Sequence, residues 1–427
     1  MRRLAAVVLV AACNATPPST VANGSAAPTV TVDKHSGSGA QVSVAAATAS
    51  PKGGNLIEGG VKPHHEEQVV ECPAKVADTL DDDSKVTALL DEANKQIESG
   101  VFGAAWTCAD RAADLSPTSV EAHHLRGAAL AALGRDAEAA TAYSLALALD
   151  PDDPETLRAV ADFYINGKGE RGRDALRLGL ELAQRGSRRA LARRRRNAPL
   201  AADLAVLEAQ ALNDLGRSDE ALERIDAALR IAPGRGDALH EKGVALFDLS
   251  RFADAKAAFQ KALGIQPDDA YTHQMLGLTL EQLGDPTADN ELARAVKLAP
   301  AELTPPVLIS KAEFQKEIDA VIATLSPERR TRVSQIKVEI EDLPMAEDLK
   351  AVTPPFPPTI LGLYRGPVGR APAPDDEPSS IVLYRKNLAR AVKTRVELTE
   401  QIRDTLLHEI GHLEGLDEDD LRRRGME

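Results

Sequence analysis

A repeat with a period of about 34 residues constrains the fold of this chain more than any other feature. The period is marked by recurring prolines, at Pro117, Pro151, Pro233, Pro267 and Pro300, with spacings of 34, 82, 34 and 33 residues. An Ala precedes each of these prolines by five residues, and another Ala precedes it by twelve. A Gly or Ser lies half a period before each proline, at Gly100, Gly134, Gly216, Ser250 and Gly284. Such a period predicts stacked supersecondary units.

Each unit is expected to be two helices joined by a tight turn. The Gly or Ser relieves the turn, the small Ala side chains let the helix backbones approach, and the Pro ends the second helix. One hairpin cannot bury its apolar face alone, so neighbouring hairpins must stack. We expect six units between about 85 and 302, five of them well matched. The third unit is degenerate around Glu155–Gln184 and is followed by an Arg-rich insert.

This pattern resembles the tetratricopeptide repeat, and the resemblance covers about half of the chain. The resemblance implies a concave surface for a protein or peptide partner, and it implies no catalytic chemistry in the repeats. The net charge of −14 disfavours contact with phosphate backbones, so no nucleic-acid partner is expected.

Residues 1–13 have the pattern of an export signal. Arg2 and Arg3 precede a short apolar stretch, which is typical of a secretory signal peptide and too short to span a bilayer. The last four residues of this segment, Val-Ala-Ala-Cys, resemble the lipobox of bacterial lipoproteins. The resemblance implies cleavage before Cys13, acylation of Cys13, and an envelope protein with a membrane lipid anchor, on the periplasmic side of the outer membrane. An ordinary cleaved signal and a cytosolic protein with an Ala-rich start are the alternatives.

Residues 14–80 are expected to form a flexible linker. Much of the segment is Ser, Thr, Ala, Gly, Val and Pro, which cannot bury enough apolar surface to offset the entropy of ordering. Two further cysteines, Cys72 and Cys108, could form one disulfide in an oxidising compartment. The sequence leaves that bridge and a pair of free thiols equally open, because it does not give the distance between the two Cα atoms.

The repeat stops after residue 306, and residues 310–427 are expected to form a small α+β domain. The overall fold class is therefore a multidomain chain, with an all-α helical-repeat solenoid followed by this domain. An amphipathic helix is expected over Glu313–Leu325 and a final helix from about Val396 to Leu413. Three β-rich runs lie between them, at residues 336–340, 360–364 and 381–384.

The final helix contains the sequence His408-Glu409-Ile410-Gly411-His412. Residues four apart lie one turn apart on one face of a helix, so the two imidazoles can reach one metal ion. Zn²⁺ prefers such nitrogen ligands. Glu409 lies beside the pair, where it could take a proton from metal-bound water.

Two residues beyond this helix extend the pattern to H-E-x-x-H-x-x-G-x-x-E. Gly415 lies where the chain must turn sharply after the second His. Such a turn would bring Glu418 back toward the histidines as a third zinc ligand and leave the fourth position for water. Asp417, Asp419 and Asp420 compete with Glu418 for this role.

Three segments of the C-terminal domain look like one family in order and spacing, namely Leu361–Gly366, Ile381–Leu388 and Leu406–Leu421. They resemble the small bacterial zincin-like metallopeptidase domain, zincin type 1, over about residues 310–427. Members typically carry an Asp where this chain has Glu418, and the change keeps a carboxylate. The resemblance implies peptide-bond hydrolysis by metal-activated water with Glu409 as general base.

Two functions follow from these features. The first is an envelope-anchored zinc metallopeptidase whose repeats recruit protein substrates or partners. The alternative is a non-catalytic scaffolding lipoprotein, whose repeats bind proteins and whose zincin-like domain is structural or inactive. For the enzyme, groups that could stabilise the oxyanion are Tyr364, Arg365, Tyr384 and Arg385.

Overall fold

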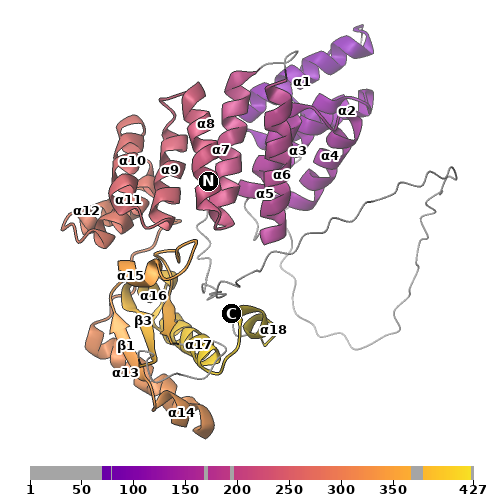
Figure 1. Ribbon diagram of the computed structural model, residues 1–427. Coiled ribbons are helices and arrows are strands. Elements are labelled where there is room, and N and C mark those ends of the chain that lie inside the picture. Colours follow the sequence, from indigo (N-terminus) through magenta and orange to yellow (C-terminus); the bar gives the residue numbers. More distant parts are fainter. Residues whose placement is uncertain (1–69, 78, 168–171, 193–196, 367–377, 425–427) are drawn as a thin grey trace, which may run out of the picture. The chain divides into compact units, whose positions relative to one another are not determined.

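A computed structural model describes residues 70–77, 79–167, 172–192, 197–366 and 378–424. The expected signal peptide, Cys13 and most of the expected linker lie outside these residues. Figure 1 shows a helical-repeat solenoid followed by a small domain. This domain contains a three-stranded sheet, so the predicted fold class is confirmed. None of the described helices combines the length and the apolar composition needed to cross a membrane.

The described part of the solenoid is a series of helical hairpins. In chain order its helices are α1 (Asp82–Glu98), α2 (Phe102–Leu115), α3 (Val120–Ala132), α4 (Asp136–Leu149), α5 (Pro154–Asn166), α6 (Arg173–Ala190), α7 (Ala198–Asp214), α8 (Ser218–Ile231), α9 (Gly236–Asp248), α10 (Phe252–Ile265), α11 (Ala270–Gln282) and α12 (Ala288–Leu298). Each odd-numbered helix packs against the even-numbered helix that follows it, which gives six hairpins within the described residues. Side-chain caps begin several helices, as at Asp81, Ser119 and Asp153.

The turns inside five of these hairpins share one backbone conformation. The four periodic glycines have φ between +66° and +78°, a left-handed conformation that glycine adopts without steric cost. Ser250 occupies the same place in its hairpin and has φ +55°, the only described non-glycine residue with a positive φ. The recurring Gly or Ser of the sequence therefore marks a backbone requirement of the turn.

Within several hairpins a large side chain packs directly onto a glycine of the preceding helix. A Cβ atom built at Gly243 of α9 would overlap the ring of Phe259 on α10. The same relation holds between Gly127 of α3 and Tyr143 of α4, where the Cβ atom would lie 2.6 Å from the ring. The glycine is needed here for close approach, because any side chain would collide with the ring.

The third hairpin, formed by α5 and α6, departs from the repeat. Its helix α6 is 18 residues long and begins after Gly172, and residues 168–171 lie outside the described part of the chain. Of the Arg-rich insert, Arg193–Arg196 also lie outside the described residues. Arg189, at the end of α6, pairs with Asp152 at 2.6 Å, and Arg185 pairs with the same carboxylate at 2.9 Å.

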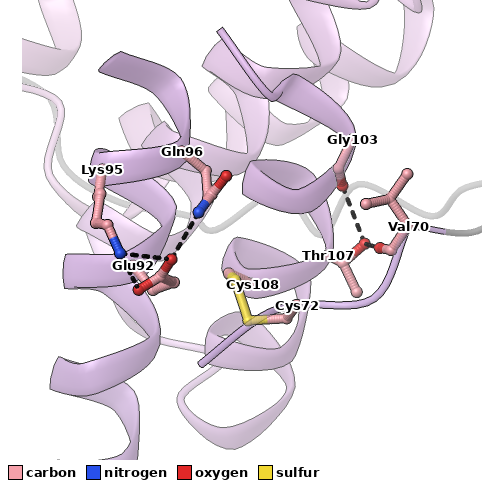
Figure 2. The surroundings of a disulfide bond; sticks show 8 residues. All are labelled: Val70, Cys72, Glu92, Lys95, Gln96, Gly103, Thr107 and Cys108. Carbon is pink, nitrogen blue, oxygen red and sulfur yellow. Dashed lines mark hydrogen bonds and ion pairs between the residues drawn. A yellow bond between two sulfur atoms is a disulfide. The ribbon is translucent and has the colours of Figure 1, made fainter. Parts of the chain in front are cut away.

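A disulfide joins Cys72 to Cys108 of α2 and decides the alternative that the sequence left open (Figure 2). Cys108 is fully buried in the core of the first hairpin. The hydroxyl of Thr107 donates a hydrogen bond to the carbonyl of Val70 at 2.6 Å, as Figure 2 shows. Residues 70–76, at the end of the expected linker, therefore lie against the first hairpin.

The C-terminal domain contains a mixed three-stranded sheet. Its elements are α13 (Lys311–Thr324), α14 (Pro327–Val333), β1 (Lys337–Glu341), α15 (Ala346–Leu349), β2 (Gly362–Arg365), β3 (Ser380–Tyr384), α16 (Arg385–Ala391), α17 (Arg395–Leu413) and α18 (Glu418–Arg423). The strand order is β1-β3-β2, with β1 parallel and β2 antiparallel to the central strand β3. Capping boxes start α13 and α17, with Ser310–Glu313 and Thr394–Glu397.

Strand alternation sends side chains to two different clusters. Tyr364 and Leu383 belong to the larger cluster, with α13 and α17. Their neighbours Leu363 and Tyr384 point to the other face of the sheet and pack with Leu349 of α15. The larger cluster fixes α17 on one face of the sheet through its buried aliphatic residues Leu398, Ile402, Leu406 and Ile410.

Candidate metal centre

Three polar side chains are buried on the C-terminal half of α17. His408, Glu409 and His412 are 1%, 2% and 3% exposed. Ionisable groups are seldom buried to this extent unless they are paired or bind a ligand. Their burial on a helix held against an apolar core is the first structural sign of a site.

The two histidines face one another. Their Nε2 atoms are 3.0 Å apart. Two Nε2 ligands of a tetrahedral zinc ion would lie about 3.3 Å apart, given Zn–N distances near 2.0–2.1 Å. The donor set and its spacing therefore fit a zinc ion.

The orientation of His412 is set by the backbone. Its Nδ1 lies 3.0 Å from the carbonyl oxygen of Leu416. A carbonyl can only accept a hydrogen bond, so Nδ1 carries the proton and Nε2 carries the lone pair. Metal-binding histidines are commonly held by such a hydrogen bond from the other ring nitrogen.

The chain turns sharply after α17. Gly415 has φ +83°, and its N–H donates to the carbonyl of His412 at 2.9 Å. The N–H of Leu416 donates to the carbonyl of Gly411 at 3.0 Å, which completes a glycine C-cap. Helix α18 then begins at Glu418.

The third zinc ligand stays a prediction. The side chains of Glu418 and Asp419 lie outside those that the structure describes. Asp417 accepts a hydrogen bond from the N–H of Asp420 at 2.8 Å, and Asp420 pairs with Arg423 at 2.6 Å. Among the described side chains, no group of three or more His, Cys, Asp or Glu residues could hold a metal ion.

Glu409 lies against the edge strand β2. A Cβ atom built at Gly362 would lie 3.2 Å from Oε1 of Glu409 and 2.7 Å from Cγ2 of Thr405. The strand therefore needs a glycine where α17 brings these two side chains. Gly362 is not among the site residues predicted from the sequence, although a glycine inside a β-rich run is a signal of close approach.

Two arginines on α14 lie near the end of α17. Nε of Arg329 is 3.5 Å from Oε1 of Glu414, and Nη1 of Arg332 is 3.8 Å from the same oxygen. Glu414 is the C-cap residue of α17, two residues after His412. This contact could not be predicted, because nothing in the spacing of α14 and α17 along the chain indicates that they meet.

Two of the residues suggested for the oxyanion lie on the far face of the sheet. Arg365 binds Asp348 through two hydrogen bonds, at 2.8 and 2.6 Å, and the hydroxyl of Tyr384 donates to Asp348 at 3.0 Å. Burial raises the pKa of Tyr384 well above its usual range, so its hydroxyl stays protonated. Of that group only Tyr364 belongs to the cluster that contains α17, and its hydroxyl donates to Oγ of Ser379 at 3.1 Å.

Arg385, the remaining residue of that group, serves a structural contact. Its Nη2 lies 2.8 Å from Asp342, which follows β1, and its Nη1 donates to the carbonyl of Ile309 at 2.6 Å. These contacts join the start of α16 to segments on either side of α13 and α14. They give Arg385 a role in the packing of the domain.

Comparison with protein families identifies both parts of the chain. Residues 333–426 match the zincin-like metallopeptidase family, and residues 120–153 and 240–302 match tetratricopeptide-repeat families. The chain therefore combines tetratricopeptide repeats with a C-terminal zincin-like metallopeptidase domain. Among curated proteins, a search finds no match.

Solved structures similar to part of this chain include PilF, PilW and YrrB. PilF of Pseudomonas aeruginosa is 15% identical, with a TM-score of 0.44 over 55% of this chain and 97% of PilF. PilW, a type IV pilus biogenesis factor, is 16% identical, with a TM-score of 0.44 over 50% of this chain and 94% of PilW. YrrB, a TPR protein with an unusual peptide-binding site, is 16% identical, with a TM-score of 0.34 over 45% of this chain and 92% of YrrB.

Proposed function

We propose that this protein is an envelope-anchored zinc metallopeptidase whose repeats recruit protein substrates or partners. The observation that carries the proposal is the pair of buried imidazoles on α17, with Nε2 atoms 3.0 Å apart and the buried carboxyl of Glu409 beside them. The match of this domain to a zincin-like metallopeptidase family supports the same reaction class.

Each residue of the centre has a role in this proposal. His408 and His412 would hold the zinc ion through Nε2, with Glu418 as third ligand. When bound, Zn²⁺ supplies Lewis-acid chemistry that polarises a peptide carbonyl and acidifies a water molecule. Glu409 would accept a proton from the attacking water and return it to the leaving amine.

The edge strand β2 offers a place for an extended substrate. The N–H of Tyr384 donates to the carbonyl of Leu361, which fixes the hydrogen-bonded pairs between β2 and β3. By alternation, the backbone groups of Gly362 and Tyr364 then face away from β3. A peptide added along this edge would pass Gly362, the residue against which Glu409 packs.

The disulfide supports the location proposed for the protein. Disulfides persist in oxidising compartments such as the bacterial periplasm and are rare in the cytosol. The bond between Cys72 and Cys108 is consistent with export directed by residues 1–13 and with a lipid anchor on Cys13.

Glu409→Gln tests the proposal, because the amide keeps the size of the side chain and loses its basicity. We expect hydrolysis of a peptide library to fall by about 10²- to 10⁴-fold, with zinc content and thermal stability unchanged. Glu400→Gln is the matched control, since Glu400 is an exposed carboxyl on the same helix. Full hydrolytic activity in Glu409→Gln would refute the proposal that Glu409 is the general base of a metallopeptidase.

The non-catalytic scaffold remains the second candidate. The observation that favours it is that two separate segments of the solenoid match tetratricopeptide-repeat families. Repeats of this kind can bind a partner without the C-terminal domain. A wild-type protein that holds zinc but cleaves no peptide in the library would support the scaffold.

A further inference from the structure

Two grooves in the solenoid have the same arrangement of ion pairs. One is formed by α2, α3 and α4, and the other by α8, α9 and α10. Each charged residue of the first groove has a charged counterpart in the second groove, at the same number of residues from the proline that closes its unit. The ion pairs are Asp110–Arg126 (3.0 Å) and Arg135–Glu138 (2.7 Å) in the first groove, and Asp226–Lys242 (2.8 Å) and Arg251–Asp254 (2.7 Å) in the second.

The apolar contents of the two grooves differ. In the first groove the guanidinium of Arg135 lies 4.4 Å above the centre of the Trp106 ring system, a cation–π contact. The position equivalent to Trp106 in the second groove is Leu222. The second groove holds an open cavity of about 490 Å³, whose apolar walls include Leu222, Leu229 and Leu246. Cavities of this size are typical of small-ligand pockets.

The exposure of the two arginines agrees with this difference. The side chain of Arg135, above the Trp106 ring, is 26% exposed. The side chain of Arg251, above the open cavity, is 55% exposed, although both arginines pair with an acidic residue three positions later. The second groove therefore has the cation of a cation–π site, Arg251, and an apolar wall of leucine side chains, but no aromatic ring between them.

None of the chain's own aromatic side chains is free to fill this cavity. Its one Trp, five Tyr and seven Phe all lie within the described residues. None of them is exposed, because each is buried or half-buried in its own part of the fold. A ring that fills the cavity must therefore come from another molecule.

We propose that the groove formed by α8, α9 and α10 binds an aromatic side chain of a partner protein. Tryptophan fits best, because it gives the strongest cation–π contact and because a tryptophan, Trp106, lies beneath the equivalent arginine of the first groove. The ring lies beneath Arg251 and against the leucine wall. This inference rests on the part of the proposed function that gives the repeats a protein partner, and it does not depend on hydrolysis.

Titration of the full-length protein with N-acetyl-5-fluorotryptophanamide, followed by ¹⁹F NMR, tests the inference. We expect a saturable shift with a Kd of the order of 1 mM. Leu222→Trp places the chain's own indole in the cavity and should abolish the saturable shift. Arg251→Ala removes the cation at an exposed position, so the fold is kept, and should weaken binding about two- to fivefold.

Leu149→Trp is the matched control, because it adds an indole at a 40% exposed position of α4 outside the groove and should bind the probe as the wild type does. The inference is wrong if the wild type gives no saturable shift, or if Leu222→Trp and Arg251→Ala both bind like the wild type. Peptide hydrolysis that depends on Glu409, measured on the same samples, separates this failure from failure of the proposed function.

Discussion

Histidines occur in both the solenoid and the C-terminal domain, and their partners differ. In the solenoid the partners repeat: Nε2 of His123 and of His273 each bonds the carbonyl of a proline six residues earlier. In the C-terminal domain His408 and His412 face each other. A partner that recurs from unit to unit indicates a role in the fold, and a pair that occurs once among the described residues indicates a site.

The electrostatic setting of the repeat histidines supports that distinction. Nδ1 of His124 bonds the hydroxyl of Thr156 at 3.1 Å, and Nδ1 of His240 bonds Thr272 at 2.7 Å, 32 residues on in both cases. Burial lowers the pKa of His124 to about 4, so the ring is neutral at physiological pH. A neutral imidazole bonded to the next repeat joins two hairpins.

The largest effect expected is on zinc content. His412→Ala removes one of two facing nitrogens, so about one zinc per chain should fall to none by elemental analysis of purified protein. His240→Ala is the control from the solenoid and should keep its zinc while losing about 1–2 kcal/mol of stability. Equal zinc content in both variants would contradict the distinction between structural histidines in the solenoid and a metal-binding pair in the C-terminal domain.

Removal of the disulfide should affect only the start of the solenoid. The bridge closes a separation of 36 residues, so Cys72→Ser with Cys108→Ser should lower the free energy of unfolding by about 3–4 kcal/mol. Chemical denaturation measures this change. The rate of amide hydrogen exchange should rise in α1 and α2 and stay unchanged in α17. A faster exchange in α17 would contradict the expectation that only the start of the solenoid depends on the disulfide.

Two glycine substitutions compare packing in the solenoid with packing at the candidate metal centre. Gly243→Ala crowds the Phe259 ring and should cost about 1–3 kcal/mol in denaturation experiments. Gly362→Ala crowds Thr405 and Glu409 and should in addition lower kcat about 10- to 100-fold, because a small displacement of a reacting group is enough to slow catalysis. Unchanged kcat in Gly362→Ala would show that Glu409 does not depend on this contact.

The smallest effect expected is a pH dependence in the solenoid. Burial raises the pKa of Asp248 to about 7, and Oγ of Ser218 donates to its carboxylate at 3.3 Å. Between about pH 4 and 7 the folded chain keeps a proton that the unfolded chain has lost, so this carboxyl lowers stability as the pH rises. Asp248→Asn should therefore gain about 1 kcal/mol relative to wild type between pH 5 and pH 6. A constant difference in denaturation midpoints would contradict this.

The solenoid was largely predictable because its signals are local. The Gly or Ser at each turn and the Ala positions recur in the sequence, and the structure gives each a local role: a left-handed φ at Gly134, or a fully buried Ala against the neighbouring helix at Ala139. The third hairpin was harder, because the connection between α5 and α6 is longer than in the other hairpins. The groove cavity could not be predicted, since it depends on which side chain faces the space between helices.

The sequence by itself determined that His408, Glu409 and His412 share a helix, because their spacing is a property of the helix alone. Only the tertiary structure decided that Gly362 lies against Glu409, that Arg365 and Tyr384 turn to the other face of the sheet, and that Cys72 meets Cys108. The physical reason is that contacts between residues distant along the chain depend on strand register and packing, which leave no periodic signal in the sequence.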